Sequence, residues 1–163
     1  MEESLQVYGR KFERAGIQVS AKIKSKVLMM GFPDQIRQVI DNLLLNALEA
    51  TPSGGRLAIS VRWARDWKKK DKSGVRLTIA DSGQGIPKEQ MAKIVEPFFT
   101  TKAEGGTGLG LWVVQGIVAK HDGSMRFRSS TREGKSGTVV SILWPSSRWN
   151  ERGEGLVESE SAA

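Results

Sequence analysis

Hydrophobic side chains between residues 34 and 50 recur at spacings of three and four positions. This spacing predicts an amphipathic helix that buries one stripe of its surface. Pro33 and Asp34 suit the first turn of such a helix, and the segment 51–55 (TPSGG) ends it. The buried stripe is expected to contain Ile36, Val39, Ile40, Leu43, Leu44, Ala47 and Leu48.

A second helix is predicted at residues 108–120, ending before Gly123. Its side chains expected to face the core are Leu109, Trp112, Val113, Ile117 and Val118. Shorter helices are predicted at residues 4–14 and 88–95.

Alternation of apolar and polar residues predicts strands, and lysine-rich or glycine-rich turns join them into hairpins. The predicted strands cover residues 17–23, 57–63, 75–80, 125–129 and 138–144. Another short apolar run covers residues 27–30. Residues 96–107 have no clear period and are rich in Thr, Gly and Lys, which indicates a mobile loop.

Helices and mostly antiparallel strands in this order predict an α+β fold. We expect a two-layer α/β sandwich, with a mixed, mostly antiparallel sheet and helices packed on one face. The 163 residues fit one domain, which we expect at residues 16–146. Residues 1–15 are expected to be the end of a helical connection from a preceding domain, and residues 147–163 a flexible tail.

Composition excludes several classes of chemistry. The chain has no cysteine and a single histidine, His121, so thiolate chemistry is excluded and a histidine-built metal site is not expected. No apolar run is long enough to span a bilayer, and the N-terminus lacks a signal core, so we expect a cytoplasmic chain. The question whether a longer parent protein is anchored in a membrane stays open.

The net charge of +7 is compatible with nucleic acid, an anionic membrane or a polyphosphate ligand. It is also compatible with no such partner, because Lys68, Lys69 and Lys70 fall in an expected solvated turn. Basic residues do not alternate with aromatic ones along the sequence in a way that suggests one nucleic-acid-binding face. We therefore expect no nucleic acid partner and no membrane contact by this chain.

Polar residues interrupt the predicted helix 34–50 along one edge. Asn42 and Asn46 are four positions apart and Glu49 follows three later, so all three share that edge. An amide oxygen can bind Mg²⁺ and an amide NH₂ can donate to phosphate. The alternative is that they are only the polar border of a buried stripe.

Asp81 follows the predicted strand 75–80, where its carboxylate could accept a hydrogen bond from an exocyclic amine such as that of adenine. Gly83 and Gly85 would allow positive φ angles and a close approach of the backbone to a flat ring, next to Ile86. An ordinary Asp-Ser-Gly turn is the alternative.

The loop that follows contains Phe98 and Phe99, which need a place to be buried, and Lys102, which could reach a phosphate. Residues 105–111 (GGTGLGL) then lead directly into the helix 108–120. Glycines that free backbone N–H groups at a helix N-terminus favour an anion site. This is the strongest single indication of a phosphate ligand.

These four segments, in this order, resemble the asparagine box, first glycine box, phenylalanine box and second glycine box of histidine kinase catalytic domains. That family belongs to the GHKL superfamily of ATP-binding (Bergerat) folds, and the resemblance covers roughly residues 16–145. It implies ATP and Mg²⁺ as ligands. The residues that it implies in the nucleotide site are Asn42, Asn46, Glu49, Asp81, Gly83, Gly85, Ile86, Lys102, Gly106, Thr107, Gly108, Leu109, Gly110, Leu111 and Thr138.

Within this set the resemblance implies particular roles. Asn46 would be the Mg²⁺ ligand, with Asn42 beside it on phosphate or metal-bound water. Asp81 would hold the adenine amine, and Thr138 would lie behind the base. Lys102 and residues 106–111 would cover the phosphates. Glu49 departs from the basic residue that many members carry, which puts its role in doubt.

The resemblance also bears on the reaction. In the ATPase members a glutamate four residues before the metal-binding asparagine is the general base for water, and here that position is Asn42. Because an amide cannot accept a proton at neutral pH, we expect slow hydrolysis and transfer of the γ-phosphoryl group to a histidine. His121 suits a helix C-cap, so we expect the acceptor on a separate dimerisation domain of a homodimeric parent, with a response regulator as the indirect partner.

Two alternatives stay open. A GHKL serine kinase of the anti-sigma type would use the same pocket but would phosphorylate a serine of a partner protein. A catalytically silent regulatory module would bind ATP without transferring phosphate. A basic nucleic-acid binder is the least favoured hypothesis.

Overall fold

The computed structural model describes residues 2–24, 31–67, 72–102 and 106–145. Its centre is a five-stranded sheet with the order β1-β2-β3-β5-β4. β1 pairs with β2 in parallel, and the other neighbours are antiparallel. The strands are β1 (Gln18–Ile23), β2 (Arg56–Arg65), β3 (Ser73–Asp81), β4 (Ser124–Ser130) and β5 (Gly137–Pro145).

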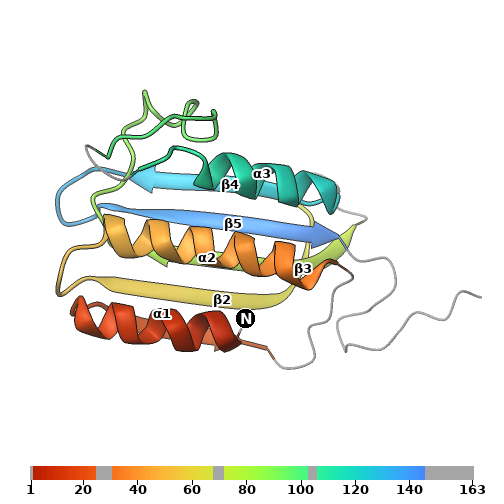
Figure 1. Cartoon of the computed structure of the whole chain (residues 1–163), viewed down its shortest axis with the longest axis horizontal. Helices are drawn as coiled ribbons and strands as arrows, with labels where there is room; N and C mark the ends of the chain where they lie inside the picture. Colours follow the sequence, from red (N-terminus) through yellow and green to blue (C-terminus); the bar gives the residue numbers. More distant parts are fainter. Residues whose placement is uncertain (1, 25–30, 68–71, 103–105, 146–163) are drawn as a thin grey trace, which may run out of the picture.

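Three helices, α1 (Glu2–Arg14), α2 (Pro33–Ala50) and α3 (Gly110–Lys120), lie on the same face of this sheet (Figure 1). α2 contacts α1 on one side and α3 on the other. The expected two-layer α+β sandwich with helices on one face is therefore confirmed. Among the described helices, none is long and apolar enough to cross a bilayer.

The core lies between α2 and the sheet. The apolar stripe predicted for α2 is confirmed: Val39, Ile40, Leu43, Leu44 and Ala47 are buried, and Ile36 and Leu48 pack against the core. α1 also contributes to this core, because the Phe12 side chain is only 1% exposed.

Two sequence-based expectations about helices were wrong. Residues 88–95 form consecutive turns rather than a helix, with bonds that mostly join residues three apart, such as Lys93 N–H to the Gln90 carbonyl at 2.8 Å. The Trp112 side chain is 49% exposed, because Val114, Ile117 and Val118 form the buried stripe of α3.

Other expectations fall on residues whose structure is not described. These are the apolar run 27–30, the lysines at 68–70 and the C-terminal segment 147–163. The five predicted strands are all present, and each end lies within two residues of the expected one.

Candidate functional site

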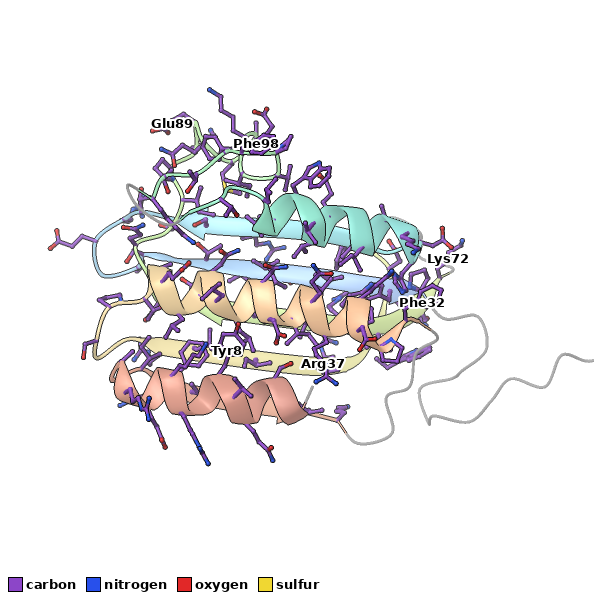
Figure 2. All side chains as sticks on the ribbon, viewed as in Figure 1. Tyr8, Phe32, Arg37, Lys72, Glu89 and Phe98 are labelled. Atoms are coloured by element: carbon purple, nitrogen blue, oxygen red, sulfur yellow. The ribbon has the colours of Figure 1, made fainter. Side chains whose placement is uncertain are left out.

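A cavity of about 740 Å³ opens between α2, the N-terminus of α3, β5 and the loop that joins β3 to α3. All the residues expected in a nucleotide site line this cavity except Gly83 and Leu109. Segments that are far apart in the sequence therefore meet at one place. The loop that joins β3 to α3 forms one wall of the cavity. Figure 2 shows Glu89 and Phe98 on this loop, above α3 in that view.

Asp81, at the end of the central strand β3, is held by two backbone donors. Its Oδ1 accepts hydrogen bonds from the Gly83 N–H at 2.9 Å and from the Thr138 N–H at 3.1 Å. Burial raises the pKa of this carboxyl above its usual range, although the two N–H donors act in the opposite direction. Neither bond involves Oδ2, which leaves that oxygen for a hydrogen-bond donor in the cavity.

The two glycines after Asp81 are required for different reasons. Gly85 has a φ of 76°, and a Cβ there would collide with the Ser130 carbonyl on β4. Gly83 does not have the positive φ that the sequence suggested. A side chain at Gly83 would instead collide with the Ala50 carbonyl, which also accepts the Gln84 N–H at 3.2 Å. The loop therefore packs directly on the C-terminal end of α2.

Ser129 is a functional candidate that sequence reasoning missed. Its hydroxyl donates to the Gly137 carbonyl at 2.8 Å and accepts from the Ile86 N–H at 2.7 Å. Because its only proton goes to Gly137, the Thr138 hydroxyl donates across the 2.9 Å contact between the two side chains. Ser129 thereby fixes Ile86 and Thr138, which both line the cavity. Nothing in the sequence distinguishes it from another polar residue of a strand.

The polar edge of α2 forms the opposite end of the cavity. Asn42, Asn46 and Glu49 all line it, as their shared helix edge predicted. A Cβ on Gly110 would lie 3.3 Å from Asn42 Oδ1, so the start of α3 passes close to this amide. Leu109, the N-cap of α3, provides no side-chain acceptor for the first turn. The N-terminus of α3 is therefore left open for an anion on the cavity wall.

Lys102 forms an ion pair with Glu49 across the mouth of the cavity. Both side chains are 40% exposed, so the pair is accessible to water. The sequence suggested that Lys102 reaches a phosphate, and it left the role of Glu49 in doubt. In the structure the carboxylate of Glu49 holds the ammonium group of Lys102 at the edge of the cavity.

The two phenylalanines differ in exposure, and neither is fully buried: Phe99 is half-buried and Phe98 is exposed. Phe99 lines the cavity, whereas the Phe98 side chain is 75% exposed. Phe98 has a φ of 65°, and its backbone lies against Gly108, which has a φ of 67°. The loop is therefore anchored at this point by backbone contact between Phe98 and Gly108, and the phenyl ring of Phe98 projects outward.

A metal ion at this site would not be held by a cluster of protein carboxylates. No group of three or more His, Cys, Asp or Glu side chains that could hold a metal occurs in the described part of the chain. The donors on the cavity wall are the amides of Asn42 and Asn46. Such a set fits Mg²⁺ that keeps most of its contacts with water and substrate phosphates.

Comparison with known proteins agrees with this geometry. Residues 31–148 match the family described as histidine kinase-, DNA gyrase B-, and HSP90-like ATPase, so the chain belongs to this family of ATP-binding domains. Among its relatives are sensor histidine kinase ZraS of Escherichia coli (strain K12), 41% identical over 112 residues, and sporulation kinase A of Bacillus subtilis (strain 168), 38% identical over 122 residues. These alignments cover 69% and 75% of this chain but only 22% and 18% of the relatives.

Solved structures give the same result. The mycobacterial sensor histidine kinase MprB superposes with a TM-score of 0.73 at 28% identity, covering 88% of this chain and 91% of that structure. The catalytic domain of histidine kinase ThkA superposes with a TM-score of 0.71 at 28% identity, covering 88% and 90%. The chain thus has the fold of histidine kinase catalytic domains, and the resemblance stated from its four motifs is confirmed.

Proposed function

We propose that this chain binds Mg-ATP and donates the γ-phosphoryl group to a histidine on a separate dimerisation domain, in two-component signal transduction. The observation that supports this most directly is the convergence of Asp81, Asn42, Asn46 and the N-terminus of α3 on one cavity. One end offers a buried carboxylate and the other offers amides and a helix N-terminus. A purine and a polyphosphate require this pair of environments.

At the base end, Oδ2 of Asp81 accepts the exocyclic amine of adenine. Ile86, half-buried, and Thr138, 6% exposed, lie beside the ring. Gly85 contributes no side chain, which leaves room for the ring against the backbone. A guanine, which has a carbonyl in place of that amine, would face a carboxylate, so the site selects adenine.

At the phosphate end, Asn46 would ligate Mg²⁺ and Asn42 would contact phosphate or metal-bound water. Bound Mg²⁺ would neutralise charge on the phosphates. Lys102 and residues 106–111 cover the phosphates, with the first N–H groups of α3 directed toward them. When ATP binds, the ammonium group of Lys102 leaves the Glu49 carboxylate and pairs with a phosphate, which is a stronger acceptor for a point charge.

Hydrolysis is disfavoured by the residues that border the phosphate end. Asn42, which lies at this end of the cavity, cannot act as a general base, because an amide does not accept a proton at neutral pH. His121 does not serve as acceptor. Its Nδ1 lies 2.9 Å from the Ile117 carbonyl and its Nε2 accepts the Phe32 N–H at 3.2 Å, so both ring nitrogens are engaged. The acceptor imidazole therefore belongs to another domain, such as the one that residues 1–15 would connect.

Calorimetric titration with ATP, ADP and GTP, with and without Mg²⁺, tests the binding step. We expect adenine-selective binding that Mg²⁺ strengthens. A histidine-bearing dimerisation domain from a sensor kinase, added in trans with γ-labelled ATP, tests the transfer step. Acid-labile label on that domain supports a histidine kinase, acid-stable label on serine would contradict it, and rapid phosphate release without label would indicate an ATPase.

A further inference from the structure

The sheet face opposite the three helices carries a concentration of positive charge. Alternate residues of a strand point to opposite faces, and Leu57, Ile59 and Val61 are buried under the helices. Their neighbours on β2, and the residues in register with those neighbours, therefore point away from the helices (Figure 1). The positions on this side include six basic residues, Lys22, Arg56, Arg62, Arg76, Arg126 and Arg128, which we call the basic face.

No acidic residue occupies this side of the five strands as the structure describes them. The other positions carry uncharged and mostly small side chains, such as Ala58, Ser60 and Thr78. All members of the basic face except the half-buried Arg76 are exposed. Asp66, one position beyond β2, is an acidic residue whose charge acts on Arg76.

The crowding of positive charges on the basic face lowers the stability of the folded state. Arg62 and Arg76 are directly opposite each other in the register of β2 and β3, and like charges at such positions repel. Burial lowers the pKa of Arg76 most strongly, and the charges of Arg62 and Arg126 lower it further, against the opposing effect of Asp66. Surfaces that serve only solubility intersperse both signs of charge. The crowding of one sign of charge on this face therefore has no explanation in folding or solubility.

Part of the basic face is also pre-organised. The Trp67 ring lies 4.9 Å from the guanidinium carbon of Arg76 and 4.6 Å from that of Arg126, within the range of cation–π contact. Leu143, which is opposite Arg76 in the register, lies on the same side of the sheet and outside the main core cluster. It is nevertheless fully buried, so neighbouring groups already cover this part of the face. A guanidinium group that already has a fixed position loses less conformational entropy when it binds.

We propose that the basic face is a docking surface for a carboxylate-rich segment of a partner protein. Five of the six cations are arginines, whose planar guanidinium groups bind carboxylates through two parallel hydrogen bonds. The side chains between these cations are mostly small, so an extended acidic segment can approach the strands closely. The surface lies on the opposite side of the sheet from the nucleotide cavity, so both can be occupied together.

Other polyanions fit the basic face less well. A single-stranded nucleic acid needs aromatic rings for base stacking, and the described aromatic ring on this face, Trp67, is already engaged by two arginines. A membrane surface favours protruding apolar side chains beside the cations, and the exposed positions of this face carry none as large as leucine.

A binding measurement with a defined acidic probe tests the proposal. The probe is a fluorescein-labelled peptide of alternating glutamate and serine, and anisotropy is recorded with the full chain at several salt concentrations. The double variant Arg62→Glu with Arg128→Glu should bind this peptide about tenfold more weakly or worse. The control is Arg10→Glu with Arg14→Glu on α1, which changes the net charge equally at exposed positions and should leave the affinity within about twofold.

A stability measurement separates docking from folding. Arg62→Glu alone places a carboxylate opposite Arg76, so its melting temperature should equal or exceed that of the parent, and ATP binding should be unchanged. Equal loss of peptide binding in both double variants would overturn the proposal, as would the absence of saturable binding. Tighter binding of duplex DNA or phosphatidylserine vesicles through the same arginines would overturn the assignment to a protein partner.

Discussion

The end of the cavity around Asp81 is held by backbone hydrogen bonds, whereas the end around Asn42 is closed by a loop with far fewer constraints. At the Asp81 end, Gly83 and Gly85 are pressed against main-chain carbonyls, and Ser129 satisfies three polar groups at once. At the Asn42 end, an exposed ion pair between Glu49 and Lys102 ties the loop to α2. Such a pair contributes roughly 0–1 kcal/mol.

In the proposed nucleotide complex, this difference separates the end that would recognise the base from the end that would recognise the phosphates. The base end is formed before the ligand arrives, so it can discriminate between bases at little cost in reorganisation. The phosphate end depends on a loop whose ionic contact must be exchanged for contacts with the nucleotide. Substitutions at the base end should therefore have large effects, and substitutions in the ion pair should have small ones.

Asp81→Asn should have the largest effect. An asparagine can keep its oxygen toward the N–H groups of Gly83 and Thr138, but its NH₂ then faces the adenine amine, so a hydrogen bond is replaced by repulsion between donors. We expect ATP affinity to fall about 30- to 100-fold, which corresponds to roughly 2–3 kcal/mol. Calorimetric titration with ATP measures this, and an unchanged affinity would remove Asp81 from the base site.

Gly85→Ala should destabilise the fold and weaken nucleotide binding less than Asp81→Asn does. The variant combines an unfavourable φ of 76° with a collision against the Ser130 carbonyl, and we expect a loss of at least about 1–3 kcal/mol in the free energy of unfolding. Gly134→Ala is the matched control, because Gly134 has a φ of 70° and no atom within 4 Å of its added Cβ. Equal destabilisation of both variants in urea denaturation would show that the close approach to β4 is unimportant.

The pH dependence of binding gives a smaller but specific effect. Asp81 accepts a hydrogen bond most strongly as a carboxylate, and protonation of Oδ2 would turn a donor toward the adenine amine, so ATP affinity should fall as the pH decreases through the pKa of this group. Because burial raises that pKa, the fall should begin at a higher pH than it would for an ordinary aspartate. The part of the pH profile that disappears in Asp81→Asn isolates this contribution from the titration of ATP itself. Identical profiles for the two proteins would contradict the assignment.

Glu49→Gln should have the smallest effect. Removing the carboxylate frees Lys102 and removes a negative charge near the phosphates, so ATP affinity should rise a few-fold with less than about 1 kcal/mol change in stability. Lys102→Met should lower the affinity by a similar factor. A large loss of affinity in Glu49→Gln would instead mean that Glu49 contacts the metal or the nucleotide directly.

Local chemistry made much of the site predictable from the sequence. Asn42 and Asn46 could be placed together because α2 has a strong and regular helical period, and Asp81 because it ends a clearly apolar strand. The five strands were predicted for the same reason. These features depend on short-range spacing, which the sequence displays directly.

The remaining features depend on long-range packing, which spacing does not reveal. The exposure of Trp112 and Phe98 is set by which side of α3 meets the sheet and by the left-handed backbone of Phe98. Ser129 acquires its role only through its position opposite Thr138 in the register of β4 and β5, which also brings its hydroxyl to the Gly137 carbonyl. The basic face likewise appears only after register brings Arg62 next to Arg76, although each arginine is an unremarkable polar position in its own strand.

The pairing of β3 with β5 also has a consequence for the order of folding. The bond between the Thr138 N–H and Asp81 joins residues 57 positions apart, whereas β2–β3 and β4–β5 are hairpins of neighbouring strands. Closing so long a loop costs more conformational entropy than closing a local hairpin, so the pairing of β3 with β5 should form late. If the proposed base site is right, a chain that has not yet released β5 from the ribosome would lack Thr138 beside Asp81, so nucleotide binding would report that β5 has joined β3.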